Sequence, residues 1–128
     1  MNHSILIVDD DKNCLEFLKD SLKTNNHSVI SSSSALDALE IMEEQAFDLI
    51  IIDVNMPEMN GVELAQKIFE LQPDIKTLGI TGGGFLGDAD HVKSIAESFF
   101  TSFLKKPFDI EVLLNITKEL LDKDYPLQ

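Results

Sequence analysis

Two short apolar runs, each ending in aspartate, constrain the fold of this chain more than any other feature. The first run, Ile5–Val8, is followed by Asp9 and Asp10, and the second, Leu49–Ile52, is followed by Asp53. Both runs are rich in β-branched residues and bounded by polar ones, which is typical of strands buried in a parallel sheet. Ligands of open α/β sheets bind beyond the carboxyl ends of the strands. We therefore expect three carboxylates to gather at one edge of the sheet.

Strand-like and helix-like segments alternate along the whole chain. The apolar patterns predict five strands, over residues 5–8, 27–32, 49–52, 75–80 and 100–104. They also predict five helices, over residues 11–25, 34–45, 89–97 and 110–122, with the third following the loop that holds Gly61 and ending at about Leu71. Asp11, Ser34 and Asp109 are the expected N-caps, and Asp37 would complete a capping box with Ser34. Right-handed crossovers between parallel strands place helices on both faces of one sheet. The sequence thus predicts a doubly wound α/β fold.

Composition indicates one domain with one apolar core. The 128 residues are 44% hydrophobic, which suits a single core, and we expect a domain of residues 1–128 with its core at about 4–122 and a short C-terminal tail. Cys14 is the one cysteine, so no intrachain disulfide can form, and we interpret it as a core residue of the first helix. The histidines do not have metal-site spacing, and surface roles are expected for His3, His27 and His91.

Charge and hydropathy exclude some classes of function. The formal net charge of −13 disfavours direct nucleic-acid binding, which depends on neutralising phosphates. No apolar stretch approaches the ~20 residues of a membrane span, and no signal peptide is recognisable. A cytoplasmic protein is the default expectation.

Groups suited to phosphoryl transfer follow the other predicted strands. The fourth strand ends at Thr81, and the fifth leads into Lys105 and Lys106. A carboxylate can attack phosphorus to give an acyl phosphate, and the transfer needs mainly positioning and charge neutralisation. Mg²⁺ prefers one or two carboxylates with phosphate oxygens and water, and lysine supplies a point charge to a phosphate oxygen.

These motifs together resemble the receiver domain of two-component response regulators. The resemblance runs from Ser4 to about Leu121 and is most specific in the block Asp48–Gly61, which reads DLIIIDVNMPEMNG. It also includes the strand ending in Thr81 and the segment Phe-Leu-Lys-Lys-Pro-Phe at 103–108. The resemblance implies a CheY-like, flavodoxin-like sheet with strand order 2-1-3-4-5.

The resemblance implies a role for each residue at the predicted edge. Asp53 would accept a phosphoryl group from a phosphohistidine on a sensor histidine kinase or a histidine phosphotransfer protein. Asp9, Asp10 and Asp53 would hold Mg²⁺, with Asp10 rather than Asp9 as the direct ligand after the first strand, and Asn55 would add its backbone carbonyl. Lys106 would contact the phosphoryl group.

Switching of a partner-binding surface is the expected output. The resemblance implies that Thr81 moves toward the phosphoryl oxygen, that Phe103 rotates inward with it, and that the Lys106–Pro107 peptide is cis. The expected surface comprises the fourth helix, the fifth strand and the fifth helix. It would bind a downstream protein target, with a phosphorylation-dependent dimer as a further option. Such a domain assists its own phosphorylation and dephosphorylation but is not an enzyme in the usual sense.

Several positions depart from the family pattern. Gly79 replaces a larger strand residue, and a triple glycine begins at Gly82, where the family has one small residue after the threonine. Phe99 and Phe100 replace the usual Gly-Ala. Phe103 lacks the hydroxyl of a tyrosine, so no switch hydrogen bond can form there.

Three alternatives remain open. The run Gly82–Gly87 matches a dinucleotide fingerprint, but no acidic residue ends the next strand as that fingerprint requires. Asp9 and Asp11 resemble the nucleophile motif of haloacid-dehalogenase-like phosphatases, although the continuation Lys12-Asn13 departs from it. A receiver-like module that binds proteins without phosphorylation is the runner-up.

Overall fold

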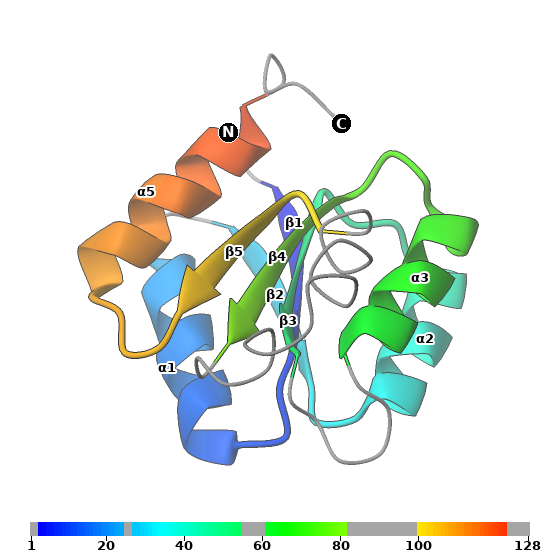
Figure 1. The fold of residues 1–128 in the computed structure, drawn as a ribbon, viewed down its shortest axis with the longest axis horizontal. Coiled ribbons are helices and arrows are strands. Elements are labelled where there is room, and N and C mark those ends of the chain that lie inside the picture. The colour runs from blue at the N-terminus through cyan, green and yellow to red at the C-terminus, as the bar shows by residue number, and fades with distance from the viewer. Residues whose placement is uncertain (1–2, 25–26, 55–60, 82–99, 123–128) are drawn as a thin grey trace, which may run out of the picture.

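Five parallel strands form one sheet in the computed structural model, in the order β2-β1-β3-β4-β5 (Figure 1). The strands are β1 Ser4–Val8, β2 Ser28–Ser32, β3 Leu49–Asp53, β4 Lys76–Thr81 and β5 Ser102–Lys105. The structure describes residues 3–24, 27–54, 61–81 and 100–122. The predicted strand order is confirmed.

Helices cover both faces of the sheet. They are α1 Lys12–Lys23, α2 Ala35–Glu44, α3 Gly61–Leu71 and α5 Ile110–Leu121. Figure 1 shows α1 and α5 on one face and α2 and α3 on the other. The helix predicted over residues 89–97 lies outside the described residues.

Alternate residues of each strand feed two separate apolar layers. In β1, Ile5 and Ile7 pack under α1 and α5, whereas Leu6 and Val8 pack under α2 and α3. All four are fully buried, and burying such a side chain contributes about 1.5–3 kcal/mol. Burial on both faces explains why these strands read as continuous apolar runs.

The helix caps follow the sequence in part. Asp11 caps α1 as expected, because its carboxylate accepts hydrogen bonds from the amides of Asn13 and Cys14. Asp109 is the N-cap of α5, but its side chain makes no capping hydrogen bond. The two residues therefore share a cap position and differ in what their side chains do there.

The capping box predicted for α2 is wrong in one half. The hydroxyl of Ser34 accepts a hydrogen bond from the amide of Asp37, as predicted. The carboxylate of Asp37, however, accepts from the hydroxyl of Ser32 rather than from the amide of Ser34. Ser32 itself accepts the bond from that amide. A buried serine at the end of β2 thus takes the place that the capping box gives to an acid.

The predicted start of β5 shifts. β5 begins at Ser102, not at residue 100, and Phe100 is buried just before the strand. The amide of Thr101 donates to the carbonyl of Thr77, and the amide of Thr77 donates to the hydroxyl of Thr101. These two bonds fix the chain as it enters β5.

The histidines are less scattered than predicted. Because Ser4 pairs with Ser28 across β1 and β2, the preceding residues His3 and His27 lie side by side, with ring centroids 5.7 Å apart. This pair lies at the amino-terminal edge of the sheet, opposite the strand-ending aspartates.

Candidate functional site

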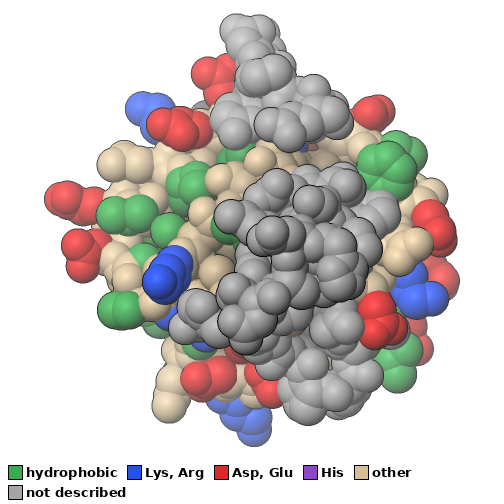
Figure 2. All heavy atoms as spheres, viewed as in Figure 1, with side chains coloured by type: hydrophobic (Ala, Val, Ile, Leu, Met, Phe, Trp, Pro, Cys, Tyr) green, Lys and Arg blue, Asp and Glu red, His purple; other side chains and the backbone are tan. Residues whose placement is uncertain are grey.

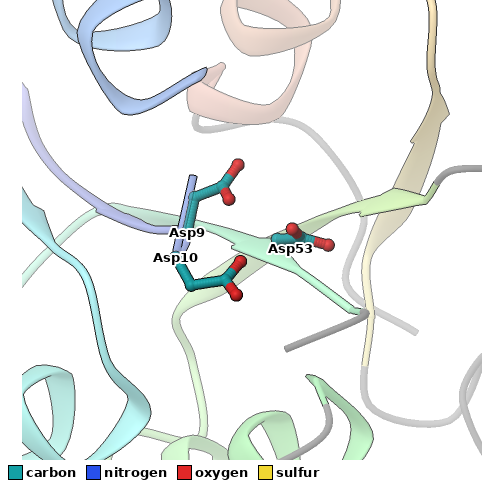
Figure 3. Close-up of side chains that lie close together, drawn as sticks. All are labelled: Asp9, Asp10 and Asp53. Atoms are coloured by element: carbon teal, nitrogen blue, oxygen red, sulfur yellow. The ribbon is translucent and has the colours of Figure 1, made fainter. Parts of the chain in front are cut away.

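The carboxyl ends of β1 and β3 bring Asp9, Asp10 and Asp53 together (Figure 3). Val8 and Ile52 are paired in the sheet, so the residue after each strand partner falls at the same edge. One oxygen from each carboxylate lies within 4.8 Å of the others. Asp9 and Asp53 are buried, whereas Asp10 is exposed. The predicted cluster is therefore present, with two of its carboxylates buried and the third open to solvent.

Lys106 faces this cluster from the end of β5. Its Nζ lies 3.9 Å from Asp9 Oδ2 and 3.9 Å from Asp53 Oδ2. Its amide donates to the carbonyl of Thr81 at 2.8 Å, and the Lys106–Pro107 peptide is cis, as the family resemblance implied. Lys105, by contrast, is exposed.

The pKa of Lys106 is raised above its usual value. Burial by itself lowers this pKa, but the negative charges of the Cys14 thiolate, Asp9 and Asp53, in that order, outweigh the burial effect. Lys106 therefore remains an ammonium ion at neutral pH. One positive charge faces three carboxylates, which leaves the cluster with an excess of negative charge.

The two carboxylate oxygens of Asp9 differ in their hydrogen bonds. Its Oδ1 accepts a hydrogen bond from the amide of Asp11 at 2.9 Å. Its Oδ2 is buried and has no hydrogen-bond partner among the residues that the structure describes. A buried carboxylate oxygen without a hydrogen bond is costly. The Lys106 ammonium 3.9 Å away faces this oxygen as an ion pair, and a directly bound cation would satisfy it. The donor set of hard oxygens and the excess negative charge fit Mg²⁺.

Thr81 lies at the end of β4, at the same edge of the sheet. It is buried and pairs with Lys105 in the register of β4 and β5. Parallel pairing thus brings its hydroxyl-bearing strand end to the same edge as Asp53. The structure places Asp9, Asp10, Asp53, Thr81 and Lys106 together there. Asn55 lies outside the described residues.

Cys14 is a site neighbour that the sequence interpretation missed. It packs against the apolar layer under α1 and α5, as expected of a core residue, but it is only half-buried and also lies against Asp9 in the first turn of α1. Burial, followed by a hydrogen bond to Asp9 and the negative charge of that residue, raises the pKa of its thiol to about 12. A thiol at neutral pH adds no charge to the site. The signal that could have predicted this contact is the position of Cys14 in the first helical turn after Asp9 and Asp10.

The remaining acidic residues do not gather into one patch on the visible surface. Figure 2 shows the acidic side chains spread around the described part of one face, with hydrophobic and basic side chains between them. This pattern is what solvated helix faces produce. The strand-ending cluster is distinguished by burial and proximity rather than by total charge.

Comparison with known protein families matches residues 5–118 of this sequence to the response regulator receiver domain family. The chain belongs to this family. Receiver domains of this kind are phosphoacceptors in two-component signalling. The receiver has the expected α/β, CheY-like architecture, and it resembles a CheY-like response regulator receiver domain protein from Methanospirillum hungatei JF-1. The TM-score is 0.86 at 29% identity, covering 96% of each chain.

Relatives of the receiver differ in length. The response regulator receiver protein CpdR of Brucella abortus (strain 2308) is 32% identical over 120 residues, covering 91% of this chain and 95% of CpdR. The transcriptional regulatory protein GlrR of Escherichia coli (strain K12) is 32% identical over 122 residues, covering 95% of this chain. The chain spans 27% of the length of GlrR. Parts of the sensor kinase CckA of Brucella abortus (strain 2308) and of a sensor histidine kinase, RcsC of Salmonella typhimurium, also match.

None of the helices in the described part of the chain is long and apolar enough to cross a membrane.

Proposed function

We propose that Asp53 is the phosphoacceptor of this receiver. The observation that carries the proposal is the position of Lys106, whose ammonium lies 3.9 Å from the carboxylates of both Asp53 and Asp9. A dianionic phosphoryl group joined to Asp53 would need cationic neighbours, and Lys106 is already there. Asp53 ends a strand that is buried along its whole length, so its carboxylate is held rigidly.

The transfer needs little from the protein beyond position and charge. A carboxylate oxygen of Asp53 attacks phosphorus, the N–P bond of a phosphohistidine on the partner breaks, and the electron pair returns to the imidazole. The product is an acyl phosphate. Lys106 binds a phosphoryl oxygen, and the hydroxyl of Thr81 donates to another. Hydrolysis of the acyl phosphate later restores the carboxylate, so the domain assists its own reactions without being an enzyme in the usual sense.

Asp9 and Asp10 would hold Mg²⁺, with Asp10 as the more direct ligand and the backbone carbonyl of Asn55 completing the protein's contribution. When bound, Mg²⁺ neutralises phosphoryl oxygens during transfer. Two observations support this assignment: Asp9 Oδ2 is buried with no hydrogen-bond partner among the described residues, and the carboxylate of Asp10 is exposed. The other oxygen of the Asp9 carboxylate accepts a hydrogen bond from the amide of Asp11, which holds this carboxylate in place.

The partner classes follow from the chemistry. The donor would be a sensor histidine kinase or a histidine phosphotransfer protein. The output would be a changed affinity for a downstream protein, through β5, α5 and the segment at 89–97, or for a second copy of the receiver. We infer a cytoplasmic protein in which residues 1–128 act as one receiver unit.

The phosphatase alternative is disfavoured by the role of Asp11. In that chemistry Asp9 would be the nucleophile and Asp11 a proton donor. The carboxylate of Asp11 instead accepts two amide hydrogen bonds at the start of α1, where it caps the helix. Asp9 is also 1% exposed, compared with 7% for Asp53. The glycine run of the dinucleotide alternative lies outside the described residues.

A small phosphodonor tests the proposal without the cognate kinase. Wild-type protein incubated with acetyl phosphate and Mg²⁺ should gain the mass of one phosphoryl group, and Asp53→Asn should gain none. Lys105→Met, which removes an exposed lysine next to the site, is the matched control and should be phosphorylated normally. Equal labelling of wild type and Asp53→Asn would refute the assignment. If acetyl phosphate labels neither protein and neither protein binds beryllofluoride, the result favours a module that binds proteins without phosphorylation.

A further inference from the structure

Gly79 lies directly opposite Phe103 in the pairing of β4 with β5. A Cβ atom added to Gly79 would lie 2.9 Å from both Cδ1 and Cε1 of Phe103, and 3.0 Å from Cδ1 of Phe100. Real Cβ atoms are essentially never this close to other heavy atoms. The Phe103 ring therefore occupies the space that a side chain at position 79 would fill. The backbone of Gly79 is ordinary strand, so the contact and not the backbone conformation accounts for the glycine.

A second ring completes the packing around Gly79. The ring centroids of Phe100 and Phe103 are 4.9 Å apart and the ring planes are tilted by 41°. Phe100 is buried, and the chain beside it is held by the two hydrogen bonds between Thr77 and Thr101. Phe103 is half-buried and packs on the same apolar layer. Its ring thus lies over the backbone of Gly79, with Phe100 beside it.

We propose that Gly79 is a positioning residue that holds the Phe103 ring inward, meaning over Gly79 and against Phe100, in the unphosphorylated protein. The strand backbones cannot readily separate, because β4 is hydrogen-bonded to β3 on one side and β5 on the other. A phenylalanine side chain, in contrast, changes position by rotation about χ1. A side chain at residue 79 would therefore displace the Phe103 ring toward solvent rather than part the strands.

The position of this ring is coupled to the strand ends that form the site. Gly79 and Thr81 are two residues apart in β4 and so point to the same face of the sheet. Phe103 is in β5, and Lys106, directly after that strand, donates its amide to the carbonyl of Thr81. The identity of residue 79 thus sets the starting position of an aromatic ring beside the site. This inference concerns the free protein and does not depend on Asp53 being phosphorylated.

A double-mutant cycle tests the proposed contact. In the wild-type background, Gly79→Ala should lower the midpoint of thermal unfolding, because the methyl group meets the Phe103 ring. In the Phe103→Leu background the same change should cost much less or raise the midpoint, since alanine suits a strand better than glycine. Phe17→Leu, which alters an exposed ring on α1, is the control background and should reproduce the wild-type loss. Equal losses in all three backgrounds would overturn the proposal.

Fluorine NMR of protein containing fluorinated phenylalanine gives an independent readout of ring position. Phe103→Leu assigns the resonance of residue 103. In the wild type this signal should be shielded from a soluble relaxation agent, unlike that of exposed Phe69, and Gly79→Ala should make it accessible. A wild-type Phe103 signal as accessible as that of Phe69 would overturn the proposal even if Gly79→Ala failed to fold. All measurements omit phosphodonor and Mg²⁺, so they cannot be confused with a test of Asp53.

Discussion

The ammonium of Lys106 lies 3.9 Å from Asp53 Oδ2, at the carboxyl end of β3, a strand that is apolar and fully buried from Leu49 to Ile52. The same ammonium is equally far from Asp9 Oδ2. Lys106 therefore couples the proposed phosphoacceptor to the proposed metal site.

Removing the charge of Lys106 should impair phosphorylation. Because this ammonium would neutralise a phosphoryl oxygen, Lys106→Met should slow labelling by acetyl phosphate by about a hundredfold, the lower end of the range for loss of one preorganised electrostatic contact. Time courses of the phosphorylated mass measure the effect. Lys105→Met, its exposed neighbour, should match the wild type. A Lys106→Met protein labelled at the wild-type rate would show that Lys106 has no part in the transfer.

Mg²⁺ should stabilise the folded protein through the carboxylate cluster. A cation that binds the native state alone raises the free energy of unfolding by about 2.7 kcal/mol at one hundred times its Kd. Asp10→Asn should weaken this stabilisation while leaving the fold intact, because Asp10 is exposed. Thermal unfolding with and without MgCl₂ measures it, and Asp20→Asn on α1 provides a matched change of surface charge. Identical Mg²⁺ responses of wild type and Asp10→Asn would exclude Asp10 as a ligand.

The two aspartate N-caps should differ in their contribution to stability. Asp11→Ala removes two hydrogen bonds to amides of α1 and should cost about 1 kcal/mol. Asp109→Ala removes no capping bond of α5 and should cost less. Urea unfolding of both variants in the absence of Mg²⁺ makes the comparison. A larger loss for Asp109→Ala would contradict the cap geometry.

The His3–His27 pair should make stability depend on pH in the acid range. Burial, and then the positive charge of His3, lowers the pKa of His27 below its usual 6.5. A lowered native pKa means that the unfolded chain binds the proton more readily, so the contribution is complete above pH 6.5 and is lost as the pH falls below it. His27→Asn should therefore unfold with less pH dependence than the wild type between about pH 7.5 and about pH 5.5. Equal slopes of midpoint against pH would contradict this origin.

Much of the fold could be predicted because strands that are buried on both faces of the sheet appear in the sequence as continuous apolar runs. Ile5–Val8 and Leu49–Ile52 read as strands since each alternate residue meets one of two apolar layers. The edge that gathers Asp9, Asp53 and Lys106 also follows, because parallel strands end on the same side of a sheet. Residues far apart in the chain are thus placed together by topology alone.

The features that escaped prediction depend on how particular side chains meet. The contact of Cys14 with Asp9 depends on how α1 starts over the end of β1. The packing of Phe103 on Gly79 depends on the register of β4 with β5, which no local pattern specifies. The carboxylate of Asp37 accepts its hydrogen bond from Ser32 because the fold places that buried hydroxyl, at the end of β2, within reach.

Chemical trapping of the phosphorylated residue tests the central claim most directly. Borohydride reduces an acyl phosphate to the corresponding alcohol, so a phosphorylated aspartate is converted to homoserine at its position in the chain. After reaction with acetyl phosphate and Mg²⁺, peptide sequencing by mass spectrometry should find homoserine at residue 53. Homoserine at residue 9 or 10, with Asp53 unmodified, would contradict the assignment of Asp53 as the phosphoacceptor.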